Sequence, residues 1–69
     1  MNKVEIQTAL SAQIAEHEEE AKKYDVTSDA GSFHRGQIRK LSQARQFVKD
    51  AITAEARYAE MTAPESKNG

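Results

Sequence analysis

Residues 25–32 read DVTSDAGS, and this polar segment divides the 69-residue chain into two longer segments. Short polar side chains and a glycine follow one another here, which favours a loop because such side chains compete with a helix for the backbone hydrogen-bonding groups. Ser28 and Ser32 are both suited to cap the helix that follows, which leaves its start open by about four residues. Because the loop is short, we expect the segments on either side of it to lie side by side and antiparallel.

The segment before the loop has the pattern of an amphipathic helix. Asn2 is followed three residues later by Glu5, a capping-box spacing in which Asn takes the place of the usual Ser or Thr. Apolar residues, with one histidine among them, then recur at steps of three and four, which places them on one narrow stripe. The stripe consists of Ile6, Leu10, Ile14, His17, Ala21 and Tyr24. We therefore predict a helix over about residues 3–24.

The segment after the loop predicts a longer helix with a wider apolar face, over about residues 33–62. At about 100° per residue its apolar positions span about 160° of the helix surface. They are Phe33, Leu41, Ala44, Phe47, Val48, Ala51, Ile52, Ala54, Tyr58 and Ala59, with Ile38 and Met61 at the edges. Pro64 is expected to end the helix, so that a hairpin of residues 1–63 is followed by a disordered tail of residues 64–69.

Size and composition together point to a partner. A chain of this length buries a marginal core, and small domains compensate with disulfides, metals or oligomerisation. The sequence has no cysteine, which excludes disulfides and thiolate ligands. The narrow stripe of the first helix cannot cover the wide face of the second, whose last turns would also extend past the start of the first. We therefore predict an all-α antiparallel two-helix hairpin that dimerises into a four-helix bundle. The alternatives are a hairpin that folds only on binding a different protein, and a loosely folded monomer.

The predicted dimer interface lies on the second helix. Its members are Leu41, Phe47, Val48, Ile52, Glu55, Tyr58 and Met61. Glu55 is a charged residue near the centre of this apolar face, and we expect it to pair across the interface with Arg45 or His17, which would fix the register of the two copies. His17 itself is interpreted as a hydrogen-bonded core histidine rather than as a metal ligand or a proton-transfer group.

Charge is distributed unevenly along the chain. Residues 1–29 carry three basic and seven acidic side chains, a net charge of −4, whereas residues 30–69 carry seven basic and four acidic ones, a net charge of +3. The acidic cluster late in the first helix and the basic cluster early in the second are each unfavourable for their own helix dipole. They comprise Glu16, Glu18, Glu19 and Glu20, and Arg35, Arg39 and Lys40. Antiparallel packing would bring the clusters side by side, so we expect them to steer pairing and register.

A basic stretch of the second helix is the strongest candidate for a ligand-binding surface. Residues 34–49 contain five basic side chains and no acidic one, and such cations are what phosphate groups bind. The candidate contacts to a partner or to nucleic acid are Arg35, Arg39, Arg45 and Lys49, and an ordinary solvated face is the alternative interpretation. The expected architecture is similar to that of the plasmid Rop protein, a dimeric helical hairpin that binds paired RNA loops, although no sequence motif is shared.

Other features narrow the class of function. No nucleophile–base pair, glycine-rich phosphate loop or metal-ligand spacing is present, so we predict that the chain is not an enzyme and carries no cofactor or metal. The N-terminus lacks the apolar run of a signal peptide, and no segment has the length of a membrane span, so we expect a cytoplasmic protein. We predict a small regulatory protein, of the kind that bacteria and phages encode, which forms homodimers and docks a helical face on a larger protein. A dimeric nucleic-acid-binding modulator is the second hypothesis, and a structural assembly component is the third.

Overall fold

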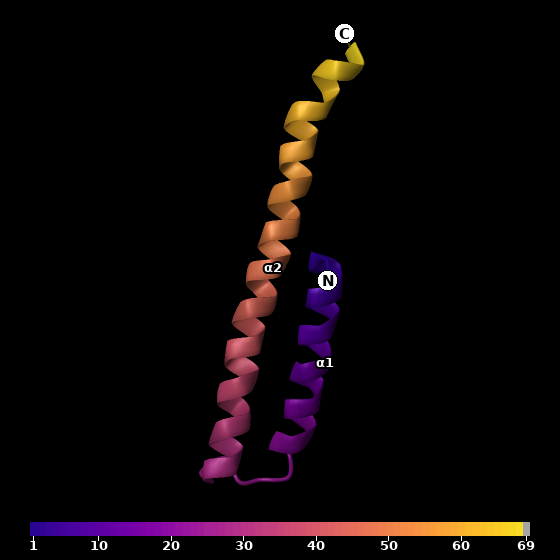
Figure 1. The fold of residues 1–69 in the computed structure, drawn as a ribbon. Helices are drawn as coiled ribbons and strands as arrows, with labels where there is room; N and C mark the ends of the chain where they lie inside the picture. Colours follow the sequence, from indigo (N-terminus) through magenta and orange to yellow (C-terminus); the bar gives the residue numbers. More distant parts are fainter. Residues whose placement is uncertain (69) are drawn as a thin grey trace.

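The computed structural model shows two α-helices that pack against each other as an antiparallel hairpin (Figure 1). It describes the backbone of residues 1–68 and the side chains of residues 1–62. Helix α1 comprises Lys3–Ala21 and helix α2 comprises Asp29–Asn68, and residues 1–68 contain no strand. The molecule is a thin rod with principal dimensions of 63 × 17 × 14 Å. The predicted all-helical hairpin is confirmed.

Helix α1 begins as predicted and ends earlier. The capping box is present, because Asn2 Oδ1 accepts from the backbone N–H of Glu5 at 2.8 Å and Glu5 Oε1 accepts from the N–H of Asn2 at 3.0 Å. The helix ends at Ala21 rather than near Tyr24. The reason is a tightening of the last turn, in which the N–H groups of Lys23 and Tyr24 each donate to the carbonyl group three residues back.

Ser28, and not Ser32, caps helix α2. The Ser28 hydroxyl accepts from the N–H of Gly31 at 3.0 Å and donates to the carbonyl oxygen of Asp25 at 2.7 Å. The Ser28 carbonyl also accepts from the N–H of Ser32 at 3.0 Å. Because Ser28 is held on both sides, the first turn of the helix forms directly after it, and α2 begins at Asp29 instead of at about residue 33.

Helix α2 also continues beyond its predicted end. Its backbone is helical through Pro64 and up to Asn68, where we predicted an end near Thr62 and a tail. Proline lacks an amide hydrogen and therefore removes one hydrogen bond, but the chain can remain helical around it at a cost in stability. Gly69, the last residue of the predicted tail, lies outside the described residues.

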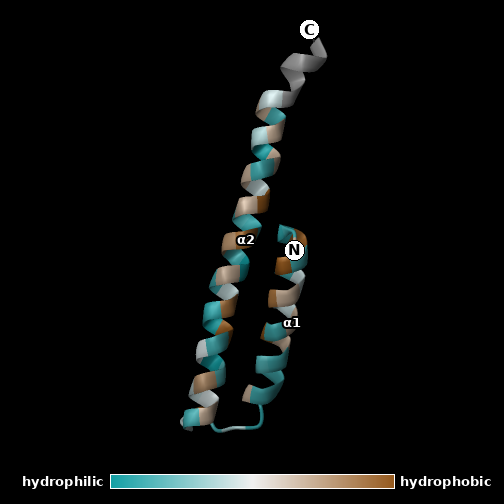
Figure 2. Ribbon diagram, in the orientation of Figure 1, coloured by the Kyte–Doolittle hydropathy of each residue, from teal (hydrophilic) through white to brown (hydrophobic). Residues whose placement is uncertain are grey.

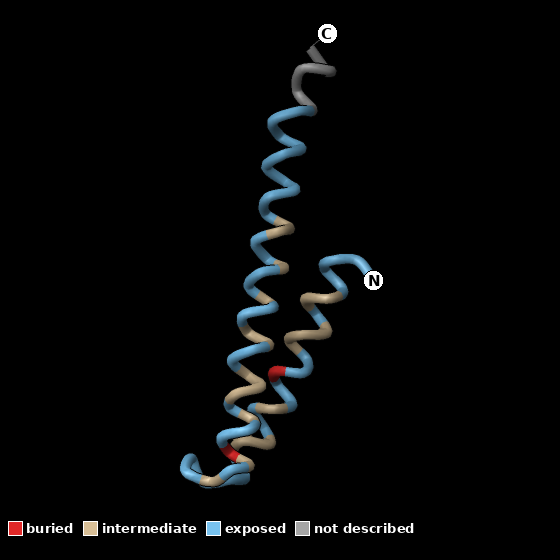
Figure 3. The backbone as a smooth tube through the Cα atoms, turned by 60° about the vertical axis from the view of Figure 1, so that its left-hand side comes forward, coloured by how far each residue is buried: buried red, intermediate tan, exposed pale blue. Residues whose placement is uncertain are grey.

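The contact between the helices buries little. Ile14 is 4 % exposed and is the only buried hydrophobic side chain among residues 1–62. Figure 3 shows few buried positions, and most of the backbone is coloured half-buried or exposed. Figure 2 shows hydrophilic residues interspersed with the hydrophobic ones along both helices. Such a thin core is at the lower limit of what sustains a fold, so burial against further helices would add substantially to stability.

The register of the hairpin leaves the later part of α2 uncovered. Lys3, the first residue of α1, forms a salt bridge to Glu55 with an Nζ–Oε2 distance of 2.9 Å. Beyond Glu55, α2 extends well past the start of α1, as Figure 1 shows. All the side chains of residues 56–62 are exposed. We call residues 56–62 the overhang.

Gly31 and Gly36 offer a matched pair of substitutions in the first turns of α2. A Cβ atom on Gly31 would collide with the backbone oxygen of Asp25, whereas one on Gly36 would meet nothing within 4 Å. We expect Gly31→Ala to lower the free energy of unfolding by about 1–3 kcal/mol, because the loop must move. Gly36→Ala should raise it by about 1 kcal/mol through helix propensity. Urea unfolding followed by circular dichroism checks both values, and an equal gain from the two variants would contradict the described loop packing.

Candidate functional site

One side of α2 packs on α1. Arg45 Nη1 donates to Ser11 Oγ at 3.2 Å, and Ile52 lines the same surface hollow as Ile6. Of the residues predicted for the dimer interface, this side holds Leu41, Val48 and Ile52, all half-buried. These three side chains are therefore used within the hairpin.

A second side of α2 is open. Phe47 is 78 %, Tyr58 is 69 % and Met61 is 72 % exposed. They lie about 110° around the helix from the side that meets α1, and small residues at steps of three and four connect them. We call this line the α2 seam; it consists of Ala44, Phe47, Ala51, Ala54, Tyr58 and Met61. Such spacing is typical of the contact line of a coiled coil. What the sequence presented as one wide face is thus divided by the structure into two.

Glu55 has a partner within the hairpin. Its carboxylate binds Lys3, while the nearest described partner of Arg45 is Ser11 and that of His17 is His34. The Lys3–Glu55 pair is largely exposed, and exposed pairs contribute only roughly 0–1 kcal/mol. Glu55 therefore helps to set the register of α1 on α2, and its pairing with Arg45 or His17 across a dimer interface stays a prediction.

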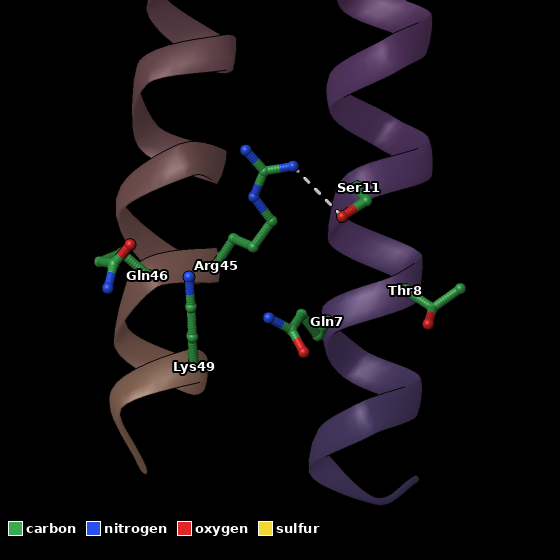
Figure 4. A pocket seen from close by; sticks show the side chains of 6 residues that line it. All are labelled: Gln7, Thr8, Ser11, Arg45, Gln46 and Lys49. Carbon is green, nitrogen blue, oxygen red and sulfur yellow. Dashed lines mark hydrogen bonds between the residues drawn. The ribbon is translucent and has the colours of Figure 1, made fainter. Parts of the chain in front are cut away.

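A polar hollow lies between the helices around Arg45 (Figure 4). Gln7, Thr8 and Ser11 of α1 line it, together with Arg45, Gln46 and Lys49 of α2. Figure 4 shows Arg45 extending from α2 toward α1, with Gln7 pointing back toward α2. Two cations and four neutral polar side chains make this lining suited to an anionic group such as a phosphate.

The structure separates the other predicted basic contacts from this hollow. The Arg35 guanidinium donates to the backbone carbonyl of Val26, so this residue braces the loop. Arg39 is exposed on α2 and does not line the hollow. Of the four predicted contacts, the structure brings together Arg45 and Lys49.

A pair of histidines meets near the loop. His17 Nδ1 and His34 Nδ1 are 2.9 Å apart, so one ring donates a hydrogen bond and the other accepts it. The Tyr24 ring stacks on His34 with a centroid distance of 5.9 Å, and Phe33 lies edge-on to His17 at 6.4 Å. His17 is hydrogen-bonded, as predicted, but its partner was not foreseen. One feature of the sequence could have indicated this contact. His17 and His34 lie at nearly equal distances along the chain from the middle of the loop, and such residues lie opposite each other in an antiparallel hairpin.

Two members of the acidic cluster pair with lysines close to them in the sequence. Among residues 1–62, Glu19 binds Lys22 at 2.8 Å and Glu20 binds Lys23 at 2.7 Å. The lysine hydrogen bond lowers the pKa of each carboxyl, and the histidine pair contributes a smaller lowering for Glu20. The predicted pairing with the basic cluster on α2 is not found among these residues, because a lysine three positions away is in reach without any constraint from the loop.

The two ion pairs of the acidic cluster predict a loss of stability in acid. Each lysine lowers the pKa of its partner carboxyl below the ordinary value of 4.5, so Glu19 and Glu20 stabilise the hairpin when they are ionised. This contribution is present above about pH 4.5 and is lost as the pH falls below that value. Both pairs are exposed, so we expect a small fall in the melting temperature.

The matched variant for this prediction is Glu19→Gln combined with Glu20→Gln, which removes both carboxyl groups. Its melting temperature should fall less when the pH is lowered from about 6 to about 3, measured at one protein concentration. An equal fall in both proteins would show that the two ion pairs do not contribute to the acid response.

Comparison with protein-family models, with curated proteins and with solved structures finds no match for this chain. No helix of the described residues is both long enough and apolar enough to cross a membrane.

Proposed function

We propose that this chain is a non-enzymatic interaction protein that works as a homodimer, pairs through the α2 seam, and docks on a larger protein with the surface that remains. The observation that carries the proposal is the exposure of Phe47, Tyr58 and Met61 along one line of a hairpin with a thin core. Single exposed hydrophobic residues are ordinary on soluble proteins, but an aligned set of large ones marks an interaction surface.

The burial of the exposed side chains of the α2 seam in a dimer is energetically favourable. Fully burying a side chain of this size contributes roughly 1.5–3 kcal/mol. In a symmetric dimer every such residue is buried twice, once in each copy. The hairpin buries little of its own apolar surface, so association would be a large part of the stability of the folded state.

Surface remains for a larger partner after such pairing. Val4 on α1 is 60 % exposed and Phe33 at the start of α2 is also exposed, and both lie outside the α2 seam. The hairpin is an elongated rod with a few exposed hydrophobic side chains among polar ones. Such a helix can lie in a hydrophobic groove on the surface of another protein.

Light scattering across a range of protein concentrations tests the proposal. The chain has a mass of 7.7 kDa, and we expect particles of twice this mass at micromolar concentrations. Folded particles of 7.7 kDa at every concentration would contradict the homodimer. Open-ended growth to larger particles would instead indicate an assembly component.

A second candidate function rests on the polar hollow. Arg45 and Lys49 lie there together without a carboxylate in the lining, which favours binding to the phosphates of a nucleic acid. A gel shift with structured RNA should weaken steeply with added salt and be abolished by Arg45→Glu combined with Lys49→Glu. Lys22→Glu combined with Lys23→Glu, just after α1 and away from the hollow, is the control with the same change in net charge. Binding that survives the double substitution would contradict this function.

A further inference from the structure

We infer that the second copy packs antiparallel on the α2 seam, so that Asp50 of each copy binds Arg57 of the other. This inference rests on the proposed homodimer and adds its orientation and its charge pairs. Three features of the hairpin support it, namely the order of residues along the seam, the position of the two charges beside it, and the length of the overhang.

The seam is complementary to itself when the helices run in opposite directions. The middle of the seam lies between Ala51 and Ala54, and in a symmetric pair a two-fold axis passes through this point. Phe47 then faces the partner's Tyr58. The same pairing sets Ala44 against the partner's Met61, which matches a small side chain with a long one. The small residues at the centre allow the helices to approach closely, and an aromatic pair lies on either side of them.

The charges beside the seam favour the same direction. Asp50 and Arg57 line one surface hollow together with Tyr58 and Met61, so both border the seam. They are seven residues apart and occupy equivalent positions of the seven-residue repeat. In an antiparallel pair, equivalent flanking positions face each other, which brings Asp50 to the partner's Arg57 twice by symmetry.

A parallel pair would have the opposite electrostatics. There, residues that flank the seam on different sides meet, and Asp50 would approach the partner's Glu55, a residue of like charge. Within residues 1–62, Arg57 has no salt-bridge partner of its own, and Asp50 accepts a hydrogen bond from Gln46 at 2.9 Å. Like charges brought together disfavour a pairing, so the charges select the antiparallel arrangement.

Antiparallel pairing would also cover the overhang. The α1 helix of the same chain begins opposite Glu55 and therefore cannot reach residues 56–62. Antiparallel pairing sets Met61 level with the partner's Ala44, in a stretch of α2 where the partner's hairpin has both helices. Each overhang would therefore lie along the body of the other hairpin, and the overlap of about 25 Å would be the length of the interface.

Charge exchange tests the pairing. Asp50→Arg places like charges opposite each other in a homodimer, and Arg57→Asp does the same with the opposite sign. At low salt we expect each variant to self-associate roughly tenfold more weakly than the natural chain. An equimolar mixture of the two variants should form heterodimers of natural affinity, because every contact is again between opposite charges. The double variant Asp50→Arg/Arg57→Asp should likewise form homodimers of natural affinity.

Cysteine cross-linking tests the direction independently, and the chain has no cysteine that would interfere. Ala44→Cys and Met61→Cys should form a disulfide with each other when the two variants are mixed. Neither should cross-link with itself, because an antiparallel pair holds the two equivalent positions about 25 Å apart. Ala15→Cys, on the exposed side of α1, is the control that should not cross-link.

The outcomes separate this inference from the proposed function. A natural chain that stays monomeric overturns both. A dimer whose strength is unchanged in Asp50→Arg and in Arg57→Asp, or whose Ala44→Cys variant cross-links with itself, overturns the antiparallel seam alone. Restored heterodimers in the mixture, together with disulfides between the Ala44→Cys and Met61→Cys variants, support it.

Discussion

Replacing Phe47 by glutamate is expected to weaken self-association at least about 100-fold, because each dimer would then bury two carboxylates in an apolar contact without a partner. Phe47 is largely exposed in the single hairpin, so the substitution leaves the contact of α1 with α2 intact. Sedimentation analysis across a concentration series measures the effect directly. Tyr58→Glu should behave in the same way, since Tyr58 lies on the same line.

The matched control is Val4→Glu, which introduces the same charge at an exposed hydrophobic position of α1. It should leave the dimer unchanged. Melting offers a second readout, because the melting temperature of a dimer rises with concentration, by roughly 10 °C for a hundredfold increase in a molecule of this size. The natural chain and Val4→Glu should show this rise, and Phe47→Glu should lose it. Equal self-association of all three proteins would contradict a dimer that pairs through the α2 seam.

Truncation of Ile14 is expected to have the largest effect on the fold of the hairpin itself. Ile14 is 4 % exposed and lies on the stripe of α1 that faces α2. Ile14→Ala should lower the free energy of unfolding by about 2–4 kcal/mol per chain, from lost burial and from the cavity that remains. For a hairpin with so small a core, this is a large part of the total.

Val4→Ala is the control for Ile14→Ala, because it also shortens a β-branched side chain on α1 but at an exposed site. It should change the free energy of unfolding by no more than about 0.5 kcal/mol. Urea unfolding at one protein concentration compares the two variants. If Ile14→Ala costs no more than Val4→Ala, then Ile14 is not the centre of the contact between the helices.

The parts of the fold that sequence reasoning predicted well are those that depend on near neighbours in the chain. The capping box of Asn2 and Glu5 is present, because both partners belong to one turn of helix. The start of α2 was harder to predict, since Ser28 and Ser32 are equally good capping residues. The choice depends on the bond from the Ser28 hydroxyl to the carbonyl of Asp25, which exists only in the folded loop.

The candidate site was predicted in part. Phe47, Tyr58 and Met61 were predicted for the dimer interface, which stays a prediction, and in the single hairpin they are exposed. Helical spacing alone could not separate them from Leu41, Val48 and Ile52, which turn toward α1. The histidine pair was missed for a related reason. A stripe on one helix reveals which residues share a side, but it does not reveal which residue of the other helix lies opposite.

By itself, the sequence determined that this protein has two helices, a polar loop between them and more apolar surface on the second helix than the first can cover. These properties depend on local hydrogen bonding and on the spacing of apolar residues at the period of the helix. Both can be read from residues that are close together in the sequence. Which side of α2 faces α1, and which side remains open as the α2 seam, is known only from the folded hairpin. The rotation of one helix against the other depends on how the loop closes and how side chains interdigitate, and neither is a property of a single helix.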